Sequence, residues 1–359
     1  MKIKFLKAFN GDCIWISFLD NTASPKNILV DGGTGDTYKS KSNTKGDLFE
    51  AIEEIRKTDQ FIDLLILTHF DDDHIGGILR WLNKNEKDFN LIKKVWFNSG
   101  KKIAKKFESD ENKDLDIEIV DEVDDFHTSP KQGIKFEKYL ENNNLWDGEI
   151  VEQGSTCDLF GLKFKFLSPN TEKLYNLLKL YEKQKDYFTN GDEYDFQTSL
   201  KDFIDEESQP DFKFKEDNTV ANGSSIAFIM EYEGKNFLFL ADAHPSVVIE
   251  GLNGFDYNKN NPLNVELMKV SHHGSMYNTN KELLGIVKTD NYIISSNATK
   301  HGLPNKRTIA RIIRNNPNAI IRFNYDLTNH IFLAQDWDGF TEFKAKQTNE
   351  FIYQWTKTI

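Results

Sequence analysis

The sequence predicts an α+β protein in which apolar strands lead into loops that carry Asp and His. The clearest case is the apolar run at 64–67, which is followed by the segment THFDDDHIGG at 68–77. From residue 75 to residue 82, apolar side chains recur at helical spacing, which indicates a strand, a sharp loop and then a helix. Comparable strands that end in polar residues recur after residue 225.

Bulk composition allows a sizeable hydrophobic core. The chain has 359 residues, of which 38% are hydrophobic and 13% aromatic, enough for one large domain or two smaller ones. No low-complexity linker divides it, so we expect a single domain over residues 1–359 with insertions at about 101–150 and 171–216. The first insertion is partly acidic, as in a solvated helix or loop. The second is helical and charged, which is typical of a lid or specificity element.

The net charge of −12 restricts the classes of partner. It argues against a broad grip on a nucleic-acid backbone, which requires a basic face, but it permits a local basic groove or a small substrate. No apolar stretch reaches the length of a membrane span, and the N-terminus alternates like a strand rather than a signal peptide. We therefore expect a cytoplasmic protein with no membrane part. The Asn-, Lys- and Phe-rich composition suggests an AT-rich bacterial genome, and Cys13 and Cys157 are expected to be buried apolar residues.

The first 60 residues predict three strands and a helix. Residues 3–9 and 13–19 alternate like a strand pair, and a third strand at 27–31 ends in Asp31. Residues 47–57 form the helix. We expect Asp31 to cap its turn through side-chain hydrogen bonds, with a role behind the functional site as the alternative.

Later strands follow the same pattern. Residues 94–98 and 160–168 have the composition of strands, and a hairpin at 225–241 delivers Asp242. Function commonly lies on loops that a scaffold positions, so the polar strand ends are candidate site residues.

Two further strands end in histidine loops. The apolar strand at 265–270 delivers His272 and His273, and the strand at 292–296 delivers a loop with His301. Repeated Asp and His residues at strand ends suggest one sheet edge that is lined with ligands.

The segment at 68–77 predicts a metal site. Within the six positions 69–74 lie His69, Asp71, Asp73 and His74. Neighbouring carboxylates in this run repel one another. A helix N-terminus relieves this repulsion a little, whereas a divalent cation relieves far more, with the histidines as nitrogen ligands. The alternative is an Asp-rich helix N-cap with two incidental histidines.

This segment resembles the H-x-H-x-D-H signature of the metallo-β-lactamase fold, with Asp71 in place of the second histidine. The H-x-D-x-D-H variant is similar to the soluble hydrolase domain of the competence protein ComEC and its stand-alone relatives. The resemblance implies a four-layer αββα sandwich that binds two divalent metal ions. Competence proteins carry membrane helices, so only the hydrolase domain is carried over.

The resemblance also assigns roles around the hairpin. Asp242 takes the place of the carboxylate that bridges the two metal ions, with simple turn capping as the alternative. The ligand before the hairpin is usually histidine, and Asn222 stands there in an Asn-x-x-Ser run. Asn222 could offer its amide oxygen to a metal, hydrogen-bond the ligand shell, or only form a turn.

The segment at 269–275 resembles the K-V-x-H-H-G-S run of the same branch. One of His272 and His273 is implied to complete the second metal site, and we favour His272, while the other would face the substrate or brace the first. Lys269 is assigned to contact a substrate anion, with a snorkelling side chain as the alternative.

The remaining assignments concern proton transfer. His301 resembles the late Gly-His-Pro element of the branch, although two residues are inserted before the proline, and is assigned as proton donor or phosphate contact. Asp73 is implied to orient the attacking hydroxide. His244 is a weaker candidate, and His127 and His330 are assigned to structure or surface.

Together these residues imply a binuclear metal-dependent hydrolase that uses a metal-bound hydroxide. The first hypothesis is a phosphodiesterase or nuclease that acts on single-stranded nucleic acid or a small phosphodiester. The alternatives are a hydrolase of a carboxylic ester, thioester or lactone, and a non-catalytic binding or sensor module. The oxygen-rich ligand set shifts the metal preference from zinc towards manganese or magnesium, so we expect two Zn or Mn ions. The sequence identifies no protein partner.

Overall fold

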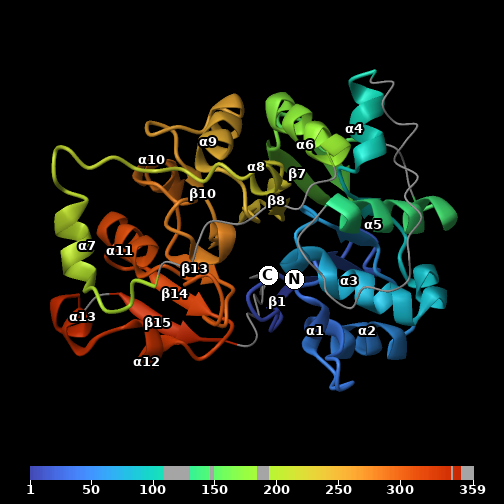
Figure 1. Ribbon diagram of the computed structural model, residues 1–359, viewed down its shortest axis with the longest axis horizontal. Helices are drawn as coiled ribbons and strands as arrows, with labels where there is room; N and C mark the ends of the chain where they lie inside the picture. Colours follow the sequence, from blue (N-terminus) through green and yellow to red (C-terminus); the bar gives the residue numbers. More distant parts are fainter. Residues whose placement is uncertain (109–129, 146–148, 184–193, 341–342, 349–359) are drawn as a thin grey trace. The chain divides into compact units, whose positions relative to one another are not determined.

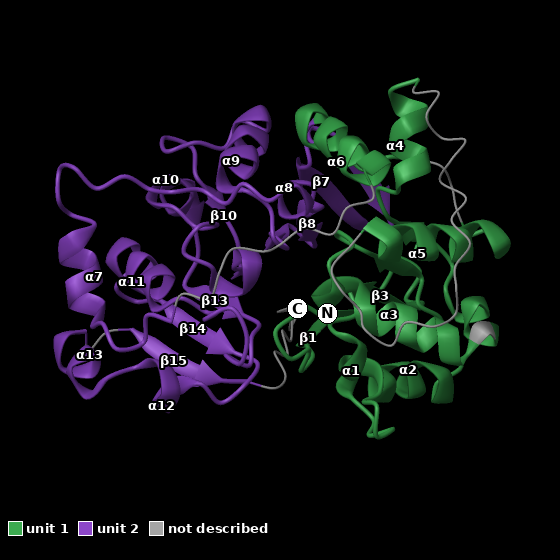
Figure 2. Cartoon of the chain, in the orientation of Figure 1, with its two compact units in different colours: residues 1–151, 171–189, 350–359 green, residues 152–170, 190–349 purple. Residues whose placement is uncertain are grey.

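The computed structural model contains helices and sheets in the mixed α+β arrangement that the sequence predicts (Figure 1). The chain forms two compact units, each built from more than one stretch of sequence (Figure 2). Unit 1 is Met1–Val151, Thr171–Thr189 and Glu350–Ile359, and unit 2 is Glu152–Asn170 and Asn190–Asn349. The single domain with insertions remains a prediction. The structure describes residues 1–108, 130–145, 149–183, 194–340 and 343–348.

Unit 1 contains a five-stranded sheet in the order β1-β2-β3-β4-β5. The first two strand pairs are antiparallel, and the pairs β3–β4 and β4–β5 are parallel. Because parallel strands end at the same edge, the residues after β3 and β4 lie close together, and the Asp31 amide donates to the Ile66 carbonyl at 2.9 Å. The strands are β1 Lys2–Phe5, β2 Ile14–Leu19, β3 Pro25–Val30, β4 Leu64–Ile66 and β5 Val95–Trp96.

The helix after β4 begins directly at the acidic loop. It spans Asp72–Lys84 (α3), and Ile75, Ile78, Leu79 and Leu82 are all buried, which confirms the predicted helical spacing. The remaining helical elements of the unit are α1 Gly35–Tyr38, α2 Asp47–Lys57, η1 Glu86–Leu91, α4 Gly100–Lys106, α5 Pro130–Asn142 and α6 Thr171–Lys183.

Unit 2 contains an eight-stranded sheet in the order β15-β14-β13-β11-β9-β8-β7-β6. Strands β6, β7, β8 and β9 pair antiparallel with one another in that order. Strands β9, β11, β13, β14 and β15 pair parallel in that order. Strands β10 Leu263–Asn264 and β12 Val287–Lys288 form a separate parallel pair. The eight strands are β6 Thr156–Leu159, β7 Leu162–Ser168, β8 Ala227–Tyr232, β9 Lys235–Phe239, β11 Leu267–Lys269, β13 Asn291–Ile294, β14 Ile320–Phe323 and β15 Lys344–Gln347.

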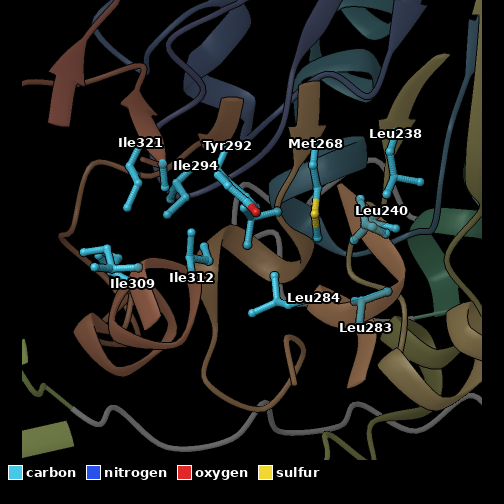
Figure 3. Close-up of a cluster of buried hydrophobic side chains, with 14 of the residues drawn as sticks. Leu238, Leu240, Met268, Leu283, Leu284, Tyr292, Ile294, Ile309, Ile312 and Ile321 are labelled. Carbon is cyan, nitrogen blue, oxygen red and sulfur yellow. The ribbon is translucent and has the colours of Figure 1, made fainter. Parts of the chain in front are cut away.

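One face of this sheet packs against helices (Figure 3). Side chains of β9, β11 and β13 meet Leu283 and Leu284 of α10 and Ile309 and Ile312 of α11 in one buried cluster. The other face carries an aromatic row, in which the rings of Phe228 and Phe239 stack 5.1 Å apart. The helical elements of unit 2 are α7 Leu200–Glu206, α8 Val220–Gly223, α9 Pro245–Gly254, η3 Ser271–Gly274, α10 Lys281–Ile286, α11 Lys306–Asn315, α12 Thr328–Ile331 and α13 Ala334–Gly339.

The two units repeat one pattern of strand pairing. In unit 1, the antiparallel pair β2–β3 is followed by the parallel strands β4 and β5, and in unit 2 the antiparallel pair β8–β9 is followed by β11 and β13. The sequence shows no repeat of fixed period, because pairing order leaves little trace in residue identity. In both units, the loops that follow these strands carry Asp and His residues.

Several expected boundaries differ from the observed ones. The strand expected at 3–9 ends at Phe5, and the strand expected at 160–168 begins at Leu162 as β7, after a turn that follows β6. Cys13 is buried as expected, whereas Cys157 is partly exposed. Among the described residues, none of the helices has both the length and the apolar character that crossing a membrane requires.

Candidate metal ligands in each unit

The loop after β4 places four candidate ligands at the start of α3. Asp71 is the N-cap residue by backbone conformation, yet its side chain makes no capping hydrogen bond. His69, Asp71 and His74 are buried, and Asp73 is partly exposed. The Asp71 carboxylate is therefore not used to cap the helix, and its role as a metal ligand remains a prediction.

Asp31 holds the first histidine pair in place. Its carboxylate accepts bonds of 2.8 Å from the Thr68 amide and from the Thr68 hydroxyl, and it lies 2.8 Å from Nδ1 of His74. Burial raises the pKa of Asp31, and the charge of His74 together with these hydrogen bonds partly offsets the rise. The backbone of Asp31 is left-handed, with a φ of 56°. The Asp31 side chain thus holds the loop at Thr68 and braces a candidate ligand, whereas the expected capping of its own turn remains a prediction.

Both histidines of unit 1 turn Nε2 towards a carboxylate. Nε2 of His69 lies 3.8 Å from Oδ2 of Asp71, and Nε2 of His74 lies 3.9 Å from Oδ1 of Asp73. These distances are too long for a hydrogen bond. Two donors that each lie about 2.1 Å from one zinc ion are at most about 4.2 Å apart, so the spacing suits a shared cation.

Asn10 makes a contact with Asp73 that the sequence did not predict. Its amide nitrogen donates to Oδ2 of Asp73 at 3.0 Å, and the Asp12 amide donates to the Asp73 carbonyl at 3.1 Å. A Cβ at Gly11 would lie 1.8 Å from that carbonyl oxygen, so only glycine fits this close approach. The turn after β1 therefore fixes both the backbone and the carboxylate of Asp73.

Tyr181 of α6 is a second unpredicted neighbour of the acidic loop. Its ring meets Phe70 edge to face at a centroid distance of 5.3 Å. Burial, with the charges of Glu137 and Asp71, raises the pKa of Tyr181 well above its ordinary value. The phenol is therefore neutral beside these two acids.

In unit 2, Asp242 lies directly opposite two histidines. Nε2 of His272 and Nε2 of His273 are each 3.7 Å from Oδ2 of Asp242. The left-handed φ angles of Ala241, His272 and His273 are 45°, 47° and 52°. Such backbone conformations cost about 1–3 kcal/mol each and persist where the surroundings impose them, commonly at functional sites.

The Nδ1 atoms of both histidines are held by oxygen acceptors. Nδ1 of His272 lies 2.9 Å from Oδ1 of Asn278, and Nδ1 of His273 lies 3.0 Å from the Ser295 carbonyl. Nε2 is therefore available for a metal in each ring. The structure turns both histidines to the same carboxylate, so the choice of His272 over His273 remains a prediction.

Asn222 contacts the shell around the histidines. Its amide nitrogen lies 2.7 Å from Oδ2 of Asp217 and 3.3 Å from Nδ1 of His272. Burial raises the pKa of Asp217, but hydrogen bonding and the charge of His272 outweigh it and hold that pKa well below its ordinary value. Conversely, burial lowers the pKa of His272, but Asp242 and Asp217 raise it to about 10. Asp217 was not predicted as a site residue, because the only indication in the sequence is that it is an acid five residues before Asn222.

Four further residues named from the sequence, Lys269, His244, His301 and His330, lie in unit 2. Lys269 is fully buried on β11, and its Nζ donates to the Val270 carbonyl at 3.0 Å, so the snorkelling alternative is wrong. His301 is partly exposed with a φ of 58°. His244 is buried, with Nε2 3.7 Å from Asp217, and His330 is exposed as predicted. His127 lies outside the described residues.

The donor sets of both units fit a divalent metal. Each combines imidazole nitrogen with carboxylate oxygen, at 3.8 and 3.9 Å in unit 1 and 3.7 Å in unit 2. Residues 16–136 match the model of the Metallo-beta-lactamase superfamily. This superfamily consists typically of metal-dependent hydrolases. The match includes the acidic loop before α3 and ends before the candidate ligands of unit 2.

Comparisons with solved structures give distant similarities. A Cronobacter sakazakii protein described as a metallo-beta-lactamase with a HARLDQ motif is 8% identical, with a TM-score of 0.29 over 68% of this chain and 63% of the other. A mutant of CmlA beta-hydroxylase is 10% identical, with a TM-score of 0.37 over 97% of this chain and 52% of the other. A metallo beta lactamase from Hirschia baltica is 14% identical, with a TM-score of 0.24 over 71% of this chain and 87% of the other.

This chain therefore spans less than two thirds of the first two proteins. No curated protein matches the chain.

Proposed function

We propose that the protein is a binuclear metal-dependent hydrolase, and that phosphodiesters are its substrates. The observation that carries the proposal occurs in each unit separately. Three buried histidines and the partly exposed His272 have Nδ1 held by a protein oxygen and turn Nε2 towards a carboxylate at 3.7–3.9 Å. The proposed ligands are His69, Asp71, Asp73, His74, Asn222, Asp242, His272 and His273.

The protein's own residues would prepare the reaction. When bound, the cations would lower the pKa of bound water and polarise the electrophile. Asp73, which Asn10 holds at 3.0 Å, would orient the attacking water. Lys269 would face an anionic group of the substrate, and His301 would supply a proton to the leaving oxygen.

The choice of phosphodiesters rests on the ligand set and on charge. Asp71, and Asn222 if its amide oxygen binds, make the set richer in oxygen than an all-histidine set, which favours manganese or magnesium alongside zinc. The net charge of −12 disfavours long nucleic acids, so a small phosphodiester or short single strand is favoured over a duplex.

A substrate panel with metal analysis tests the proposal. We expect about two equivalents of Mn or Zn per chain, and hydrolysis of bis-nitrophenyl phosphate or single-stranded DNA that a chelator abolishes and added Mn restores. Turnover of a thioester alone would indicate the ester-hydrolase alternative. Full activity after complete chelation would refute a metal-dependent mechanism, and metal binding without turnover of any substrate would favour a sensor.

A further inference from the structure

Behind His272, unit 2 contains a buried network of polar side chains. Two of its members, Asp217 and Asn278, are not themselves proposed metal ligands. We propose that Asp217 and Asn278 are positioning residues that fix the orientation of His272 and keep its Nε2 available to a metal. This inference rests on the proposed function, because it concerns one of the proposed metal ligands.

Asn278 determines which ring nitrogen of His272 keeps its proton when a metal binds. Its side chain is fully buried, and its amide nitrogen donates to Oδ2 of Asp217 at 3.1 Å and to the Asp242 carbonyl at 3.1 Å. Both partners are acceptors, so this assignment fixes the amide orientation and leaves Oδ1 facing Nδ1 of His272 at 2.9 Å. An amide oxygen only accepts, and it lies closer to Nδ1 than the amide nitrogen of Asn222 does, at 2.9 Å against 3.3 Å, so Nδ1 donates to Asn278.

The opposite nitrogen then faces the metal side. With Nδ1 held as a donor, the proton on Nε2 is the one that a metal ion would displace, and its loss leaves the lone pair on Nε2. That atom lies 3.7 Å from Oδ2 of Asp242. Asn278 also binds the carbonyl of Asp242, so one side chain sets the spacing between the histidine and the carboxylate.

Asp217 makes this arrangement rigid. Its Oδ1 accepts from the amide and the hydroxyl of Thr219 at 2.9 and 3.0 Å, and its Oδ2 accepts from Asn222 at 2.7 Å and from Asn278 at 3.1 Å. Oδ2 also lies 3.6 Å from Nδ1 of His272. A carboxylate behind a ligating imidazole orients the ring and raises its basicity as a ligand.

The loop that carries Asn278 is anchored from outside the network. Arg311 of α11 donates to the Thr279 carbonyl at 2.9 Å and is itself held by Glu207 at 2.8 Å. The Asp217 amide donates to the Tyr277 carbonyl at 3.1 Å. The positions of Asn278 and Asp217 are thus set together.

His273 provides an internal comparison. Its Nδ1 faces the Ser295 carbonyl at 3.0 Å, a main-chain acceptor that side-chain substitution leaves in place. Substitutions in the Asp217–Asn278 network should therefore disturb His272 and leave His273 unchanged.

The test uses Asn278→Ala and Asp217→Asn in the full chain, with Mn²⁺ and Zn²⁺ as the probes. We expect metal affinity to fall about 10- to 100-fold, as for other residues that brace a metal ligand. In ¹H–¹⁵N spectra of the metal-free protein, the Nδ1–H signal of His272 should broaden or vanish in Asn278→Ala, while that of His273 persists. Thr219→Val, which removes only one bond to Asp217, should give a smaller loss and serves if the other variants do not fold.

The matched control is Asp195→Asn. Asp195 is a part-buried carboxylate of unit 2 that accepts from the amides of Lys306 and Arg307 at 2.7 and 2.9 Å. This variant should lose stability but keep metal affinity and the His272 signal. Unchanged affinity and an unchanged His272 signal in both network variants would overturn the inference. A wild-type protein without metal-dependent turnover would refute the proposed function instead, while the metal-free spectra would still decide this inference.

Discussion

At the scale of single residues, Asp73 is the carboxylate most firmly placed for a role in turnover. Asn10 holds one of its oxygens at 3.0 Å, and the other lies 3.9 Å from Nε2 of His74. Asp73→Asn keeps the shape but removes the charge, so we expect kcat/KM for bis-nitrophenyl phosphate to fall by at least about 100-fold. Circular dichroism should remain that of the wild type. Retention of more than a tenth of the activity would exclude Asp73 as a ligand.

Asp31 is expected to act through His74 and not by contacting the substrate itself. Its carboxylate lies 2.8 Å from Nδ1 of His74, so Asp31→Asn replaces a charge behind a proposed ligand with a neutral amide. We expect metal affinity, measured by competition with a chromogenic chelator, to weaken about 10- to 100-fold. Asp36→Asn, which alters a half-exposed acid that pairs with Arg80, is the control and should bind metal normally. Equal affinities of the two variants would argue against bracing by Asp31.

At the scale of elements, the contact between α3 and the turn after β3 depends on two glycines. A Cβ at Gly77 would lie 2.0 Å from the Gly32 carbonyl oxygen. Gly77→Ala must push the helix away from the turn, and we expect urea denaturation to show a loss of about 1–3 kcal/mol. Gly254→Ala at the end of α9 meets nothing within 4 Å and should be neutral or stabilise by up to about 1 kcal/mol.

The packing of α5 on α4 buries an acid and should make stability depend on pH. Burial raises the pKa of Glu137 from 4.5 to about 7, against the opposing effect of Lys101. The groups that face it are Ser99, Lys101, Glu141 and Tyr181. Because the folded state binds the proton more tightly, stability is highest below pH 4.5 as far as this group is concerned, and falls as the pH rises to about 7 and above.

Glu137→Gln removes that titration. The variant should match the wild type near pH 5 and exceed it near pH 8 by up to about 3 kcal/mol in urea denaturation. Glu141→Gln, at an exposed site on the same helix, should show the wild-type dependence. Parallel profiles for wild type and Glu137→Gln would mean that Glu137 is not buried as the structure shows.

At the scale of the whole molecule, local sequence patterns predicted the helices and strands, but they did not predict which distant residues contact one another. The apolar run at 64–67, the spacing of Ile75 to Leu82 and the hairpin at 225–241 each reflect contacts within a few residues, and each is observed. Asn10 and Asp217 were missed because they act on residues 63 and 61 positions away, Asp73 and Asn278. Such pairing follows from strand order, which hydrophobic periodicity does not encode.

The whole chain should respond to metal as one thermodynamic system. A cation that binds only the folded state stabilises it by RT ln(1 + [L]/Kd), about 2.7 kcal/mol at a hundredfold excess over Kd. We therefore expect the Tm to rise with Mn²⁺ or Zn²⁺ and to fall on chelation. His74→Ala removes a buried imidazole whose Nδ1 contacts Asp31 at 2.8 Å, so its Tm should be lower and should rise less with metal than that of the wild type. Because each unit carries proposed ligands of its own, substitutions at His74 and His273 should each reduce the response. A response abolished by only one of them would assign the cations to that unit alone.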